Sequence, residues 1–223
     1  MAKQINQGAP QMEETLSKNE AMFLKYQKQI IAAVAAVVII VAGCIIYHQY
    51  VAVPSAQKAS TALAKGQQYF QNEDYLKALN GDSIGFVGFL KIAEEGGDAG
   101  NLANLYAGLS YAQLDSWSEA VKYLEKFNQK DDAMISPAMI GAMGNAYAHL
   151  DQLDKAVSLL KEAAAKADNN SLSPTFLIQA GEILESQNKK DEALKLYQEV
   201  KDKYFNSMAY QTIDAYIERA SAK

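Results

Sequence analysis

The sequence predicts an all-α protein in which a single N-terminal transmembrane helix is followed by a solenoid of helical hairpins. Two observations carry this prediction. One is an uninterrupted apolar segment near the N-terminus, and the other is a spacing of glycine and alanine that recurs four times in the rest of the 223-residue chain. The first is typical of a membrane span and the second of stacked helix pairs.

The recurring spacing is a glycine, then an aromatic residue or leucine three positions later, then an alanine twelve positions after the glycine. It occurs at Gly66/Tyr69/Ala78, Gly108/Tyr111/Ala120, Gly144/Tyr147/Ala156 and Gly181/Leu184/Ala193. Glycine within a helix costs about 1 kcal/mol relative to alanine, and the close approach of two paired helices compensates for that cost. The spacing is that of the tetratricopeptide repeat (TPR), so we expect about four hairpins.

The first repeat is longer than the others. Gly66 and Gly108 are 42 residues apart, whereas the two following intervals are 36 and 37 residues. The extra chain falls near Asn80–Leu90, where polar and glycine residues precede an apolar stretch. The favoured interpretation is that this stretch closes the first hairpin onto the second, and the alternative is a contact surface for a partner.

Other signals mark the ends of helices. Ser136 and Ser173 each precede a proline at the start of a repeat, so their hydroxyls are expected to cap the following helices. At the C-terminus, apolar residues at helical spacing predict a capping helix with a polar outer face. These residues are Tyr210, Ile213, Tyr216, Ile217 and Ala220.

The apolar segment Ile30–Ile46 has no polar side chain over seventeen residues, which corresponds to about 26 Å of helix. With its flanks it is long enough to cross a bilayer, and lysines concentrate on its N-terminal side, at Lys18, Lys25 and Lys28. We therefore expect a cytoplasmic tail (1–28), a transmembrane helix (29–50) and a periplasmic TPR domain (51–223) of a single-pass inner-membrane protein.

Cys44 allows a second interpretation of this segment. The run Val41, Ala42, Gly43, Cys44 resembles a bacterial lipobox, in which the cysteine becomes a lipid-modified N-terminus. However, Ile45, Ile46 and Tyr47 continue the apolar segment as a spanning helix would. The favoured interpretation is a small thiol within a membrane helix.

Charge and composition indicate no chemistry of the domain's own. Residues 51–223 carry seventeen basic and twenty-three acidic side chains, a net charge of minus six, which does not suit nucleic acid. Neither histidine, His48 or His149, pairs with a nucleophile or carboxylate at a recognisable spacing, and no phosphate-binding loop is present. The acidic turn near Glu94 is better explained by solvation than by calcium binding. We expect no catalytic residue, no cofactor and no metal site.

The combination of short tail, membrane helix and TPR domain resembles the YfgM family, the ancillary subunit of the bacterial Sec translocon, and especially TPR proteins of this layout from Bacteroidota-type bacteria. The resemblance implies protein partners: translocon subunits, a periplasmic chaperone of the prolyl isomerase type, and secretory clients. The alternative function is a TPR scaffold for cell-envelope assembly.

The TPR resemblance also implies which residues face the concave groove of the solenoid. The expected groove residues are Leu105, Leu109, Gln113, Asn145, His149, Glu182 and Glu185. TPR domains that bind acidic C-terminal peptides use clamps of lysine, asparagine and arginine, and only Asn145 matches such a clamp. Binding of chaperone-type acidic tails is therefore not expected, and the groove residues themselves are apolar early and acidic late.

The intact mass of the purified protein tests the membrane interpretation. We expect a mass that retains the residues before Cys44, because the apolar helix continues beyond that cysteine. A Cys44→Ser variant should show the same length. A product that begins at a lipid-modified Cys44, and is lost in the Cys44→Ser variant, would contradict the anchor.

Overall fold

The computed structural model describes residues 10–222, and that part of the chain contains helices and no strand. The all-α prediction is therefore confirmed. The chain divides into two compact units, Met1–Ser55 and Ala56–Lys223. The first nine residues of the tail predicted at 1–28 lie outside the described residues.

The first unit consists of one long helix. Helix α1 runs from Pro10 to Tyr47, and the backbone continues as a turn of π-helix, η1, over His48–Ala52. The stretch Lys25–Tyr50 is long and apolar enough to cross a membrane, and its side chains are exposed throughout. The helix passes through Cys44 without a break, so its backbone hydrogen bonds are made internally, as a spanning segment requires.

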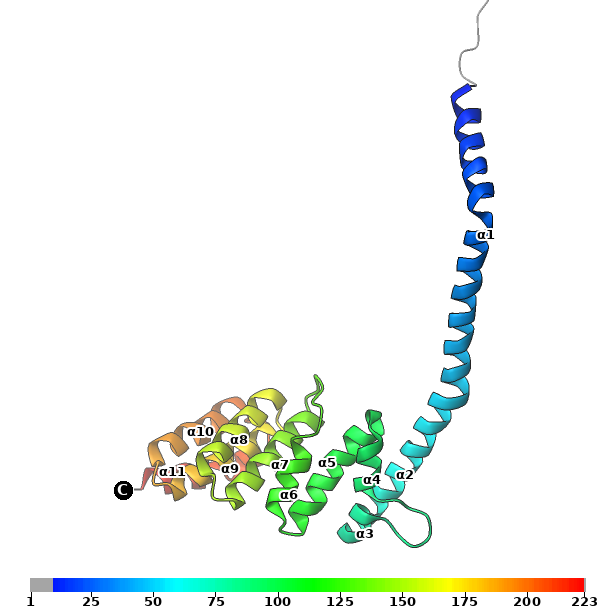
Figure 1. Ribbon diagram of the computed structural model, residues 1–223. Helices are drawn as coiled ribbons and strands as arrows, with labels where there is room; N and C mark the ends of the chain where they lie inside the picture. The colour runs from blue at the N-terminus through cyan, green and yellow to red at the C-terminus, as the bar shows by residue number, and fades with distance from the viewer. Residues whose placement is uncertain (1–9, 223) are drawn as a thin grey trace, which may run out of the picture. The chain divides into compact units, whose positions relative to one another are not determined.

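The second unit contains four helical hairpins (Figure 1). They pair α2 (Val53–Gln71) with α3 (Tyr75–Asn80), α5 (Gly97–Gln113) with α6 (Trp117–Leu124), α7 (Ile135–His149) with α8 (Leu153–Ala167), and α9 (Ser173–Ser186) with α10 (Lys190–Lys203). Helix α4 (Phe89–Glu95) lies between the first two hairpins in sequence. The 3₁₀ turn η2 (Met208–Gln211) and α11 (Ile213–Ser221) follow the last hairpin. The predicted TPR solenoid with a C-terminal helix is confirmed.

Each repeat glycine allows the two helices of its hairpin to approach closely. In the last three repeats a Cβ on the glycine would meet the residue sixteen positions later: Leu124 for Gly108, Leu160 for Gly144 and Tyr197 for Gly181. The repeat alanines Ala78, Ala120, Ala156 and Ala193 have no exposed surface. The glycines and alanines that define the sequence pattern therefore mark the contact between paired helices.

The turn inside each hairpin has one conformation in all four repeats. The residue seven positions after the glycine is left-handed, with φ of 60° at Glu73, 54° at Asp115, 59° at Asp151 and 60° at Asn188. In each repeat the backbone N–H of the residue after this left-handed one donates a hydrogen bond to the carbonyl of the residue three positions after the glycine. The N–O distances are 2.8–2.9 Å. This is the Schellman arrangement, which satisfies a free carbonyl at the helix end. The same turn thus leads the chain into the second helix in each repeat.

The first repeat departs from this pattern because α3 ends at Asn80. The position sixteen residues after Gly66 is Asp82, which lies beyond the helix in a loop. The space beside Gly66 is filled instead by the rings of Phe86 and Phe89, which a Cβ on Gly66 would meet. The inserted residues thus replace the missing turns of the second helix.

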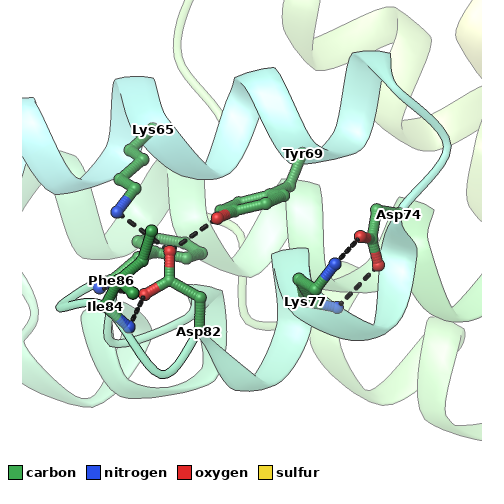
Figure 2. A network of polar contacts seen from close by, with 7 residues as sticks. All are labelled: Lys65, Tyr69, Asp74, Lys77, Asp82, Ile84 and Phe86. Carbon is green, nitrogen blue, oxygen red and sulfur yellow. Dashed lines mark hydrogen bonds and ion pairs between the residues drawn. The ribbon is translucent and has the colours of Figure 1, made fainter.

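Asp82 holds the inserted loop in place (Figure 2). Its Oδ1 accepts the backbone N–H groups of Ile84 (2.9 Å) and Phe86 (2.8 Å). Its Oδ2 accepts the Tyr69 hydroxyl (2.5 Å) and pairs with Lys65 Nζ (2.9 Å), both from α2. The bond from Tyr69 is the main cause of a pKa well below the usual value for this carboxyl, so Asp82 binds as an anion.

The inserted segment does close the first hairpin onto the second. Phe86, Phe89 and Ile92 are buried, and the Phe89 ring stacks on Tyr106 of α5 with centroids 5.2 Å apart. The favoured interpretation is confirmed for these side chains. Ile84, in contrast, is 79% exposed at the tip of the loop.

The predicted serine caps are wrong. The Ser136 hydroxyl donates to Asp132 Oδ2 (2.6 Å), and the Ser173 hydroxyl donates to Ala164 O within α8 (2.8 Å), so both hydroxyls bond to residues that precede them in the chain. The free amides of α7 are accepted by Asp132 Oδ1, which takes the N–H groups of residues 134–136. Asn169 Oδ1 does the same before α9, for residues 171 and 172. The cap of α7 thus lies four residues earlier than predicted, and before α9 the corresponding side chain bonds to the loop that leads into the helix.

The C-terminal helix covers the end of the last hairpin. Ile213 and Ala220 are buried, and Tyr216 and Ile217 pack partly buried against the same core. Tyr210, which was expected on this apolar face, is exposed, because it lies in the 3₁₀ turn before the helix begins.

A Gly108→Ala substitution should destabilise the domain. A Cβ there would lie 2.6 Å from Leu124 Cγ, and such overpacking outweighs the gain in helix propensity, for a net loss of about 1 kcal/mol in the free energy of unfolding. Chemical denaturation followed by circular dichroism measures the loss. Ser158→Ala, at an exposed position of α8, is the control and should be neutral or slightly stabilising. A Gly108→Ala protein more stable than the parent would show that the close contact is not needed.

The acid dependence of stability should report the Asp132 cap. Its bond from Ser136, together with the three backbone amides, lowers the pKa of Asp132 from 3.8 to about 2. A lowered carboxyl pKa stabilises the folded state above the unfolded pKa, and that stability is lost as the pH falls from about 4 to about 2. We expect Asp132→Asn to be less stable at neutral pH and to lose less stability over this window. Asp131→Asn, at the exposed neighbouring carboxylate, should keep the parent's acid dependence, and identical curves for both variants would refute the cap.

Candidate protein-binding groove

A cavity of about 790 Å³ lies along the first helices of the second, third and fourth hairpins, α5, α7 and α9. Residues of the α5–α6 turn and the first residue of α6 complete its wall. The lining residues are Leu109, Ala112, Gln113, Asp115, Trp117, Ala142, Asn145, Ala148, His149, Gln179, Glu182, Ile183 and Ser186.

The same repeat positions line this cavity in successive hairpins. The position directly after the repeat glycine contributes Leu109, Asn145 and Glu182, and the position four residues later contributes Gln113, His149 and Ser186. Residues four apart lie on one face of a helix. Since each glycine is held against its second helix, the positions beside it are turned toward the cavity in all three repeats.

Five of the seven expected groove residues line the cavity: Leu109, Gln113, Asn145, His149 and Glu182. Leu105 does not, because it is only 9% exposed and packs in the core that also contains Phe176. The corresponding position in the third repeat is Gly141, where the Phe176 ring packs so closely that a Cβ would not fit. This position is covered by the next hairpin in the stack.

Glu185 also lies outside the cavity. Its carboxylate pairs with the guanidinium of Arg219 from α11, with Nε 3.1 Å from Oε2, and accepts the Tyr197 hydroxyl at 2.8 Å. The bonds from Arg219 are the main cause of its lowered pKa. Burial, followed by the bond to Glu185, raises the pKa of Tyr197. Glu185 therefore attaches the capping helix to the last hairpin.

The first hairpin does not contribute to the cavity. The position two residues before the repeat glycine is Ala142 in α7 and Gln179 in α9, but it is Tyr106 in α5. The Tyr106 ring packs edge-on against Phe70 (5.5 Å), and its hydroxyl accepts a hydrogen bond from Gln67 of α2 (3.0 Å). This aromatic side chain fills the space between α2 and α5, so the open part of the groove begins at α5.

An aromatic stack forms part of the cavity wall. The Trp117 indole and the His149 imidazole lie parallel, with centroids 3.7 Å apart and an angle of 2° between the planes. They come from α6 and α7 and thus connect neighbouring hairpins. His149 is exposed and both residues line the cavity, so the stack contributes aromatic surface to its wall.

The charged side chains of the cavity are acidic. Asp115 and Glu182 are exposed, and neither takes part in an ion pair among the described residues. Gln113, Asn145, Gln179 and Ser186 add neutral polar groups, and the rest of the lining is apolar. No lysine or arginine is among the lining residues. The surface suits hydrogen-bonding and apolar groups, with a preference for positive charge.

Several lining residues were missed by the sequence analysis. Ala142, Gln179 and Ser186 share repeat positions with other cavity residues, so a consistent use of the offsets from each glycine could have found them. Trp117 and Asp115 lie in or directly after a turn, and their place follows from the left-handed turn at Asp115. That turn conformation has no signal in the sequence beyond polarity.

Comparison with known proteins places this helical domain in a secretion-related family. Residues 14–213 match the family model described as T7SS, ESX-1 secretion system protein EccA1, N-terminal domain. No curated protein matches the chain. The resemblance to the YfgM family is not tested by this match and stays a prediction. Because the match extends over most of the chain, the protein belongs to the family of the EccA1 N-terminal domain of the T7SS, ESX-1 secretion system.

Proposed function

We propose that this protein is a membrane-anchored, non-enzymatic adaptor whose groove holds an extended segment of another protein at a secretion channel. The observation that carries the proposal is the cavity along α5, α7 and α9, built from equivalent positions of three consecutive repeats. Such a surface runs across the hairpins and fits an extended chain, which can make similar contacts in each repeat.

The apolar helix supports attachment to a membrane. Lys25–Tyr50 is long and apolar enough to span a bilayer, and the excess of lysines before it favours a cytoplasmic N-terminus. In this topology the protein is a single-pass protein of the inner membrane, and the TPR domain lies in the periplasm.

Two likenesses support a role in secretion. The family that matches is named for a secretion system protein, and the layout of the chain resembles that of the YfgM family. We infer that the partners are translocon subunits, a periplasmic chaperone of the prolyl isomerase type and secretory clients. A scaffold for cell-envelope assembly is the competing function, and it is distinguished by the identity of the proteins held in the groove.

Site-specific photo-crosslinking in intact cells tests the proposal. A photoreactive amino acid is placed in the full-length protein at Gln113, Asn145 or Glu182, all in the cavity, and at Glu162 or Lys166, exposed positions of α8 outside it. We expect the three groove positions to capture secretory clients or translocon subunits, and the α8 positions to capture neither.

Each alternative outcome contradicts a stated part of the proposal. Equal capture from α8 and from the groove would remove the groove as the binding surface. Capture of envelope-assembly proteins from the groove alone would replace the secretion role with the scaffold. Absence of any groove adduct, in cells where the protein is present at its normal level, would contradict peptide binding itself.

A further inference from the structure

We propose that the occupant of this groove is an extended segment that combines apolar residues with arginine. This inference rests on the proposed function and adds the chemistry of the ligand. It follows from four features of the cavity: its unpaired acids, the helix ends around it, its aromatic stack, and its mixture of apolar and amide side chains.

Some acids near the groove are held in ion pairs, whereas the two that line it are not. Asp154 is paired with Lys189 at 2.8 Å, and Glu185 is paired with Arg219. Asp115 and Glu182, which line the cavity, make no ion pair among the described residues. Two exposed carboxylates in one cavity without a lysine or arginine attract a cationic ligand and repel an anionic one.

The C-terminal ends of three helices add to the negative potential of the cavity. Gln113, His149 and Ser186 are the last residues of α5, α7 and α9, and all three line the cavity. The C-terminal end of a helix carries partial negative charge. Three such ends beside one cavity favour positive charge in the ligand.

The Trp117–His149 stack favours arginine over lysine as the source of that charge. The two rings form a parallel pair, and His149 is exposed. A guanidinium is planar, stacks on aromatic surfaces and pairs with carboxylates through two parallel hydrogen bonds, whereas an ammonium is a compact, strongly hydrated charge. Asp115 lies two residues before Trp117, so a carboxylate and the flat surface are close in the chain.

The remaining lining suits an extended backbone with apolar side chains. Leu109, Ala112, Ala142, Ala148 and Ile183 provide apolar surface. Gln113 and Asn145 provide amides that both donate and accept hydrogen bonds, as the backbone of an extended peptide requires. Asn145, in the middle helix of the three, makes no side-chain hydrogen bond among the described residues and is therefore available for this role.

Peptide binding to the full-length protein in detergent tests this inference. The probes are fluorescein-labelled peptides of alternating serine, leucine and arginine, with matched peptides in which lysine or glutamate replaces arginine. We expect the affinity, measured by fluorescence anisotropy, to be highest for the arginine peptide, lower for the lysine peptide and lowest for the glutamate peptide. A higher salt concentration should weaken the binding of the arginine peptide more than the binding of an uncharged serine–leucine peptide.

Variants assign the preference to the groove. Glu182→Lys should weaken the arginine peptide by about tenfold and improve the glutamate peptide, because it replaces an attraction by a repulsion. Asp115→Asn should weaken the arginine peptide by about threefold, and asparagine tolerates the left-handed backbone at this position. Glu162→Lys, on the exposed face of α8, has the same charge change as Glu182→Lys and should leave every affinity unchanged.

Equal binding of the arginine and glutamate peptides, or an unchanged affinity in Glu182→Lys, would overturn the inference. This failure is distinct from failure of the proposed function. Crosslinks from Gln113 or Asn145 to secretory clients would then still establish a protein-binding groove of different chemistry. If the arginine peptide binds only when Glu162 is intact, the basic segment binds on α8, and the assignment to the groove is wrong.

Discussion

The close contact between each repeat glycine and its second helix is the constraint on which the rest of the domain depends. Leu124, Leu160 and Tyr197 occupy the volume that a side chain on Gly108, Gly144 or Gly181 would need. This contact sets the distance between paired helices and also the rotation of the first helix about its axis. Because that rotation is the same in three consecutive hairpins, the residue after each glycine and the residue four positions later face one cavity. Core packing and the groove are thus two consequences of one contact.

The first repeat shows how the contact can be made by other means. Asp82 stands where the other repeats have an apolar side chain, and an acid at that position could not be buried against a glycine without partners. The chain leaves the helix at Asn80, and Tyr69, Lys65 and two backbone amides satisfy the carboxylate at the base of a loop. The loop then delivers Phe86 and Phe89 to the glycine. Together with Tyr106 these rings fill the space between the first two hairpins, so the groove is confined to the last three.

Different interactions occupy the surface on either side of the groove, and the two acids that line it have no ion-pair partner among the described residues. At the N-terminal side an aromatic cluster occupies the surface, and at the C-terminal side Arg219 of the capping helix neutralises Glu185. Asp115 and Glu182 lie between these boundaries without ion-pair partners among residues 10–222. Unpaired charge adds little to the stability of a solenoid, and exposed charges on a concave surface act mainly on approaching ligands. This distribution is the one that the proposed adaptor, which would hold basic, partly apolar chain segments, requires.

The sequence by itself determined the all-α class, the four hairpins, the apolar N-terminal helix and the longer first repeat. Through the TPR resemblance it also gave five of the thirteen residues that line the cavity. These features depend on short-range spacing: helical periodicity, the glycine–alanine offsets and an unbroken apolar run. Only the tertiary structure decided that Leu105 is buried, that Glu185 binds Arg219, and that Trp117 joins His149 in the wall. It also showed that Asp132, and not Ser136, accepts the first amides of α7, and that Asn169 accepts the amides just before α9. The positions of Leu105, Glu185 and Trp117 depend on which residue of a distant segment reaches the same point in space, and no local pattern encodes that meeting because it follows from how the hairpins stack. The bonds of Asp132 and Asn169 are local, and they depend on the conformation of the loop before each helix.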